Sequence, residues 1–122
     1  MKKVLIVDDD PAILDALKIM LELEGYEIET ALSGEPLYNM KDNYPDLILL
    51  DIWLSGQDGR SICIYLKNNP ATKHIPVIMI SASRDVDKSA KSAGADDYIC
   101  KPFEMNDLLE KVGKLTETTV PI

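Results

Sequence analysis

Short, continuously apolar runs alternate along the chain with longer stretches of helical periodicity. The runs at residues 4–7, 47–50 and 77–80 contain no polar side chain. Strands of a parallel sheet that is covered by helices on both faces have this continuous pattern. The longer amphipathic stretches lie at 11–24, 34–42, 58–69, 85–93 and 104–116. The alternation predicts an α/β fold with right-handed crossovers, whose binding site lies beyond the carboxyl ends of the strands.

Two further segments complete the expected sheet. Residues 26–31, YEIETA, alternate in polarity as an edge strand does, and residues 97–100, DYIC, follow the fourth helical stretch. Gly25 and Gly94 come directly after helical stretches, where a left-handed residue ends many helices. The 122 residues suit one domain, which we expect over residues 1–118, with 119–122 as a tail or the start of a linker.

Composition and charge exclude several classes of function. The net charge of −8 disfavours direct binding to nucleic acid, because its phosphates attract basic surfaces. No apolar run approaches the ~18 residues that cross a membrane, and the N-terminus lacks the apolar stretch of a secretory signal. We therefore expect a cytoplasmic protein. Cys63 and Cys100 lack the spacing of metal ligands and are expected to be buried free thiols.

Three consecutive aspartates follow the first apolar run. Like charges in a row repel one another and resist burial, so each needs a reason. Asp10 precedes Pro11 and a helical stretch, which is the pattern of a helix N-cap with proline at the first helical position. Asp8 and Asp9 are left for another purpose.

Other charged or hydroxyl side chains terminate later strands. Asp51, Ser81 and Lys101 end the third, fourth and fifth expected strands, as Asp8 and Asp9 end the first. Because the carboxyl ends of parallel strands lie at one edge of a sheet, we expect these five side chains to converge. Carboxylates beside an ammonium make a hard-cation site next to an anion-binding group, as phosphoryl chemistry with Mg²⁺ requires.

Four segments, in this order, resemble the receiver domain of two-component response regulators, including the chemotaxis regulators. They are VLIVDDDP, YPDLILLDIWLSGQDG, IPVIMISA and AGADDYICKPF. The resemblance covers residues 2–116. It implies a flavodoxin-like, doubly wound sheet of five parallel strands in the order 2-1-3-4-5, with five helices.

The resemblance also implies roles for the residues at the strand ends. Asp51 matches the phosphoacceptor, and Asp8 and Asp9 match the acidic pair that holds Mg²⁺, with the backbone carbonyl of Trp53 as a further ligand. Lys101 matches the lysine that pairs with the phosphoryl oxygens.

Further positions match the parts of the family's switch. The hydroxyl of Ser81 and the N–H of Ala82 would bind the phosphoryl group, and Tyr98 would move inward once Ser81 is engaged. A cis peptide bond is implied between Lys101 and Pro102. Ser55 stands where proline is usual, and we expect it not to take part in the chemistry.

The implied function is that of a switch and not of a turnover enzyme. A histidine kinase or a phosphotransfer protein would phosphorylate Asp51, and the change would reach an effector through the fourth helix, fifth strand and fifth helix. The domain would be a monomer or a weak, phosphorylation-dependent dimer.

Three alternatives stay open on the residues alone. Asp8-Asp9-Asp10 can be interpreted as the Asp-x-Asp of a haloacid-dehalogenase-like phosphatase, although the usual Gly and Thr and the cap insertion are missing. A receiver-like interaction module that is not phosphorylated is opposed by the intact Asp9, Asp51, Ser81 and Lys101. A flavin-binding domain of the same topology lacks a Ser/Thr/Gly-rich loop after the first strand.

Overall fold

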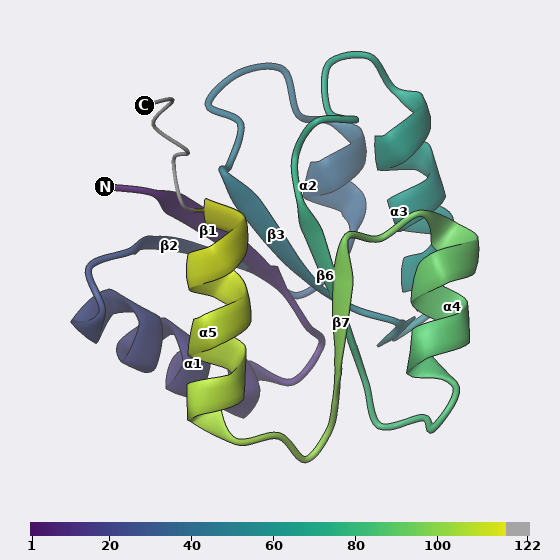
Figure 1. The fold of residues 1–122 in the computed structure, drawn as a ribbon. Coiled ribbons are helices and arrows are strands. Elements are labelled where there is room, and N and C mark those ends of the chain that lie inside the picture. The colour runs from purple at the N-terminus through teal and green to yellow at the C-terminus, as the bar shows by residue number, and fades with distance from the viewer. Residues whose placement is uncertain (117–122) are drawn as a thin grey trace, which may run out of the picture.

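A parallel sheet forms the centre of the molecule, as the ribbon in Figure 1 shows. The computed structural model describes residues 1–116. The strands of this sheet are β1 (Lys3–Val7), β2 (Glu27–Ala31), β3 (Leu47–Asp51), β6 (Val77–Ser81) and β7 (Asp97–Cys100), in the order β2-β1-β3-β6-β7. In the described residues the helices are α1 (Pro11–Leu23), α2 (Glu35–Tyr38), α3 (Gly59–Asn68), α4 (Val86–Ala93) and α5 (Met105–Thr116). Counted along the large sheet this is the order 2-1-3-4-5, so the predicted flavodoxin-like fold is confirmed.

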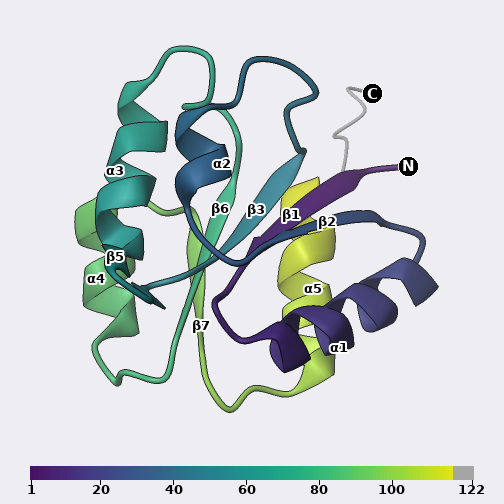
Figure 2. The same cartoon turned by 180° about the vertical axis from the view of Figure 1, so that it is seen from behind.

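Helices cover both faces of the sheet. Helices α1 and α5 lie on one face and α2, α3 and α4 on the other, which the two opposite views make plain (Figures 1 and 2). Each central strand contributes to both cores: Val4 and Ile6 pack with α1 and α5, whereas Leu5 and Val7 pack with α2, α3 and α4. This two-sided burial is why residues 4–7, 47–50 and 77–80 of the central strands are all apolar, and polar side chains occur only at the strand ends.

The helix boundaries follow the capping chemistry expected from the sequence. Asp10 caps α1 by accepting a hydrogen bond from the backbone N–H of Ala12 at 2.9 Å, and Pro11 is in the first turn. Gly25 and Gly94 take φ values of +93° and +82°, the left-handed conformation that glycine adopts without strain.

Helix α2 is much shorter than the predicted 34–42. It ends at Tyr38, and Leu37 is its buried residue, so no apolar face extends the helix against the core. The side chain of Asn39 turns back to the carbonyl of Glu35 at 3.2 Å, and Asn43 takes a φ of +52°. These polar residues favour turns over helix.

A small antiparallel hairpin follows β3 and was not predicted. Strands β4 (Trp53–Leu54) and β5 (Gln57–Asp58) pair two residues each, with Ser55 and Gly56 between them. Gly56 has a φ of +72°. The hairpin lies at the carboxyl end of β3, beside the predicted site.

Two further predictions concern the C-terminal tail and membrane-spanning segments. The expected tail at 119–122, and with it the boundary at residue 118, lies outside the described residues. Over residues 1–116, no helix is both long enough and apolar enough to cross a membrane.

Candidate functional site

Three charged side chains meet where β1, β3 and β7 end. Lys101 places its ammonium between two aspartates, with Nζ 3.0 Å from Asp8 Oδ2 and 3.3 Å from Asp51 Oδ2. Asp8 is 2% exposed and Asp51 6%. Buried carboxylates need a compensating partner, and here one ammonium serves both.

Asp9 completes an acidic cluster at the same edge. One carboxylate oxygen from each of Asp8, Asp9 and Asp51 lies within 4.8 Å of the other two. Carboxylate oxygens are the ligands that Mg²⁺ prefers, and it binds through one or two of them while it keeps several waters. The donor set therefore fits Mg²⁺, and the ammonium of Lys101 shows that the cluster accommodates positive charge.

The surroundings of Asp51 shift its protonation. Burial and, second, the negative charge of Asp8 raise the pKa of Asp51, and together they outweigh the charge of Lys101 and the hydrogen bond from the Trp53 N–H. Burial alone would lower the pKa of Lys101, but its hydrogen bond to Asp8 and the charge of Asp51 raise it. Lys101 thus stays a cation, and Asp51 gives up its proton less readily than an ordinary aspartate.

The β4–β5 hairpin touches two of the clustered carboxylates. The backbone N–H of Trp53 donates to Asp51 Oδ1 at 3.1 Å. The hydroxyl of Ser55, a residue expected to take no part in the chemistry, donates to Asp9 Oδ2 at 2.8 Å and so contacts the acidic cluster directly. Gly59 lets the chain pass close to β3, because a Cβ there would collide with the carbonyl of Asp51 and would lie 2.8 Å from the Cα of Ile52.

Comparison with known proteins decides the family. Residues 4–113 match the description "response regulator receiver domain". This chain belongs to the response regulator receiver domain family. Membership of this family rules out the interpretations of the chain as a haloacid-dehalogenase-like phosphatase and as a flavin-binding domain.

Relatives and solved structures agree with the receiver assignment. The domain is 38% identical to the DNA-binding dual master transcriptional regulator RpaA of Synechocystis sp., over 122 residues that cover 98% of this chain and 51% of the relative. A putative response regulator from Chloroflexus aurantiacus is 36% identical with a TM-score of 0.87, covering 94% of this chain and 97% of that one. The response regulator TrrA from Thermotoga maritima, solved in complex with Mg²⁺-BeF, is 38% identical with a TM-score of 0.83, covering 94% and 99%. The receiver domain thus spans about half the length of RpaA and nearly all of the two solved chains.

Ser81, at the end of β6, lies beside the charged cluster of the receiver domain. Its side chain is fully buried, and its Oγ accepts a hydrogen bond from the N–H of Ser83 at 3.0 Å. Lys101 is tied to the same strand end, because its N–H donates to the carbonyl of Ser81 at 2.8 Å. Ala82 follows and lines an apolar hollow of about 400 Å³ with Ile13, Lys101, Pro102 and Phe103. The peptide bond between Lys101 and Pro102 is cis.

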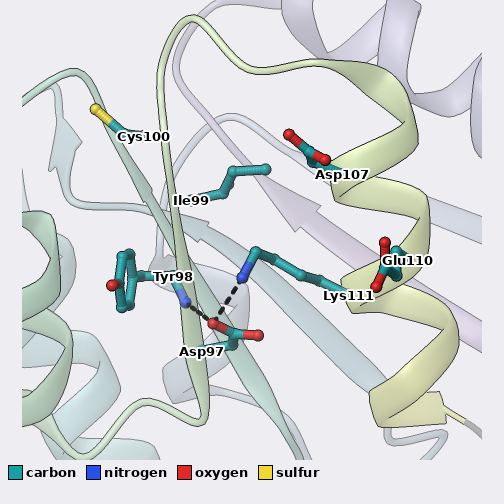
Figure 3. A pocket seen from close by; sticks show the side chains of 7 residues that line it. All are labelled: Asp97, Tyr98, Ile99, Cys100, Asp107, Glu110 and Lys111. Carbon is teal, nitrogen blue, oxygen red and sulfur yellow. Dashed lines mark hydrogen bonds and ion pairs between the residues drawn. The ribbon is translucent and has the colours of Figure 1, made fainter.

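Tyr98 lies on the outer side of the receiver domain, between α4 and α5. Tyr98 is 38% exposed, and Lys111 Nζ lies 5.7 Å from its ring centroid. Figure 3 shows Lys111 reaching from α5 to Asp97, which it contacts at 3.0 Å. Cys100 lies on the same surface and is exposed, so the expectation of a buried thiol is wrong for Cys100 and confirmed for Cys63. Both cysteines are free.

A cation–π pair beside the site was also not predicted. The guanidinium carbon of Arg60 lies 5.0 Å from the ring centroid of Trp53 and is paired with Asp58 at 2.7 Å. Asp58 caps α3 by accepting a hydrogen bond from the N–H of Arg60 at 2.9 Å. An aspartate at the start of a helical stretch is a sequence signal for such a cap, and it is the one signal that could have placed Arg60 near Asp58. Trp53 itself is 55% exposed.

Proposed function

We propose that this receiver domain accepts a phosphoryl group on Asp51 from a phosphohistidine of a histidine kinase or phosphotransfer protein, in a reaction that needs Mg²⁺. The observation that carries the proposal is the ammonium of Lys101, shared at 3.0 and 3.3 Å by Asp8 and Asp51. A carboxylate nucleophile, an acidic cation site and an ammonium for the phosphoryl oxygens are what phosphoryl transfer requires.

The reaction begins at the Asp51 carboxylate. One of its oxygens attacks phosphorus, the P–N bond of the donor breaks, and the electron pair stays on the histidine nitrogen. Lys101 then pairs with the oxygens of the transferred group. The hydroxyl of Ser81 already accepts from the N–H of Ser83 and so has its own proton to donate to the phosphoryl group, beside the N–H of Ala82.

Four residues would hold Mg²⁺. They are Asp8, Asp9 and Asp51 through carboxylate oxygens, directly or through water, and Trp53 through its backbone carbonyl. When bound, Mg²⁺ supplies positive charge opposite the oxygens of the transferred group. Attack of water on phosphorus then releases phosphate and restores the Asp51 carboxylate.

The output would pass through the surface of α4, β7 and α5. Helix α4 is held by few apolar side chains, with Val86, Ala90 and Ala93 as its buried residues. An element with so little buried area shifts at low cost in free energy. Engagement of Ser81 by the phosphoryl group would draw Tyr98 inward and change the surface offered to an effector protein or to a second copy of the domain. Direct binding of this chain to nucleic acid is disfavoured by its net charge of −8.

Intact-mass analysis with a small phosphodonor such as acetyl phosphate tests the proposal. The wild-type protein is expected to gain one phosphoryl group in Mg²⁺ buffer and none in EDTA. Asp51→Asn should abolish the gain, while the matched control Asp10→Asn, at an exposed helix cap, should keep it. Label at Asp8, or no label in any condition, would contradict the proposal, and the second result would favour an interaction module that is not phosphorylated.

A further inference from the structure

The turn of the β4–β5 hairpin brings a hydroxyl to the acidic cluster. Ser55 Oγ donates to Asp9 Oδ2 at 2.8 Å, a contact between residues 46 apart in the chain. The ammonium of Lys101 contacts the other two carboxylates of the cluster, Asp8 and Asp51. Within residues 1–116, the hydroxyl of Ser55 is the side-chain partner that holds the carboxylate of Asp9.

The hairpin is fixed in place by contacts on both sides of the turn. Leu54 is buried in the core beside α3. Gln57 accepts a hydrogen bond from the N–H of Gly34 at 2.7 Å, and the N–H of Trp53 donates to Asp51. Because the turn is anchored in this way, Ser55 presents its hydroxyl from a defined position. The contact with Asp9 therefore restrains a metal-binding side chain.

The turn itself does not need serine at position 55. Ser55 and Gly56 connect the paired residues Leu54 and Gln57, and the φ of +72° at Gly56 is that of the third residue of a type II turn. Proline is favoured at the second position of such turns, where it presets φ. Serine gives up this restraint and provides a hydrogen-bond donor that proline lacks. A role beyond the turn therefore accounts for the side chain of Ser55.

We propose that Ser55 is a positioning residue for Asp9, whose carboxylate it orients toward the divalent cation of the acidic site. The proposal rests on the Mg²⁺-dependent function proposed above. Donation to Oδ2 leaves the lone pairs of Oδ1 and one of Oδ2 free for a cation. Hydrogen bonds of this kind fix the orientation of a ligand, and their loss typically weakens metal binding by 10–100-fold. The same bond couples the hairpin, and with it the carbonyl of Trp53, to the occupancy of the site.

The test compares Mg²⁺ affinities of four variants by calorimetry and by the emission of Trp53. Ser55→Ala and Ser55→Pro, which keeps the turn but removes the hydroxyl, are expected to raise the dissociation constant about tenfold. Ser55→Thr retains the hydroxyl and should stay within about twofold of wild type. Ser61→Ala, at an exposed position on α3, is the matched control and should bind as wild type does. In Mg²⁺-free buffer, Ser55→Pro should melt at or slightly above the melting temperature of the wild type, because proline presets the turn, and the other variants should melt close to the wild type.

Several results would overturn the role of Ser55. Unchanged affinity in both Ser55→Ala and Ser55→Pro, or tighter binding in either, would show that the hydroxyl does not position Asp9 for the cation. A lower melting temperature in Mg²⁺-free buffer with an unchanged dissociation constant would assign Ser55 to the stability of the hairpin. Absence of Mg²⁺ binding in the wild-type protein would instead contradict the proposed function of the whole site.

Discussion

Replacing Asp51 by asparagine is expected to stabilise the protein at neutral pH in Mg²⁺-free buffer. The variant removes one of three carboxylates whose oxygens lie within 4.8 Å of one another. With an effective dielectric constant of about 20, each repulsion at that distance is worth about 3.5 kcal/mol. The attraction lost at the 3.3 Å contact with Lys101 is worth about 5 kcal/mol on the same scale. The two repulsions exceed the one attraction by about 2 kcal/mol, and screening by solvent reduces this to a net gain of about 1 kcal/mol.

The gain should depend on pH in a defined direction. Burial, followed by the charge of Asp8, raises the pKa of Asp51 in the folded protein. The folded state therefore binds more protons than the unfolded chain between the ordinary pKa of about 3.9 and the raised value. The free energy of unfolding of the wild type falls as pH rises through that window and stays low above it. Asp51→Asn has no ionisable group at this position and does not show this fall. The difference in free energy of unfolding between the variant and the wild type should therefore be small near pH 3 and reach its full size at pH 7.

Urea unfolding at several pH values, with and without Mg²⁺, measures both effects. Mg²⁺ should stabilise the wild type increasingly with concentration, and should stabilise Asp51→Asn less, because the variant has lost one of the proposed ligands. The difference in free energy of unfolding between Asp51→Asn and the wild type at pH 7 should therefore decrease as Mg²⁺ is added. If Asp51→Asn were destabilising at pH 7 in Mg²⁺-free buffer and followed the same pH profile as the wild type, repulsion within the cluster would be the wrong account of this site.

Three further outcomes are expected. Lys101→Ala leaves two buried aspartates without their shared ammonium and should lower the free energy of unfolding at pH 7 by about 2 kcal/mol in urea, part of which Mg²⁺ restores. Burial raises the pKa of the Cys63 thiol to about 11, so a thiol reagent at pH 8 should label only Cys100 until the protein is unfolded. Gly59→Ala should cost about 2–3 kcal/mol in the same urea assay because its Cβ meets the backbone of β3. Gly113→Ala, in α5, where a Cβ would meet the hydroxyl of Tyr26 at an ordinary contact distance of 3.8 Å, should be neutral or slightly stabilising, and equal effects of the two glycine substitutions would refute the steric argument.

The sequence predicts the sheet and its site because both follow from short-range and topological rules. The central strands are recognised by runs without polar residues, and parallel connections bring their carboxyl ends to one edge. Asp8, Asp51 and Lys101 could therefore be placed together before any distance was known. The cap at Asp10 is local and needed only its neighbour Pro11 and the helical stretch that follows.

The features that were missed depend on contacts between distant segments or on very few residues. The hairpin has two-residue strands, too short to give a periodic pattern. The bond between Ser55 and Asp9 joins segments whose distance is set by the packed fold. Helix α2 stops early because little of it is buried, and the exposure of Cys100 follows from its place on an edge strand. Tertiary packing decided the position of Ser55 and the exposure of Cys100, whereas at α2 the turn preference of Asn39 and Asn43 acted together with the small buried area.

The contact between Lys101 and Asp8 joins residues 93 apart. It therefore links the end of β1, which comes first in the chain, to the end of β7, which comes last among the strands of the large sheet. During synthesis from the N-terminus, Asp8, Asp9 and Asp51 leave the ribosome well before Lys101. A chain that ends before residue 101 has all three carboxylates and lacks the lysine that offsets them. Its strand ends repel one another until β7 pairs with β6 and brings the ammonium into place. Assembly of the charged edge therefore coincides with completion of the sheet, and fragments that stop short of β7 should fold poorly at low ionic strength.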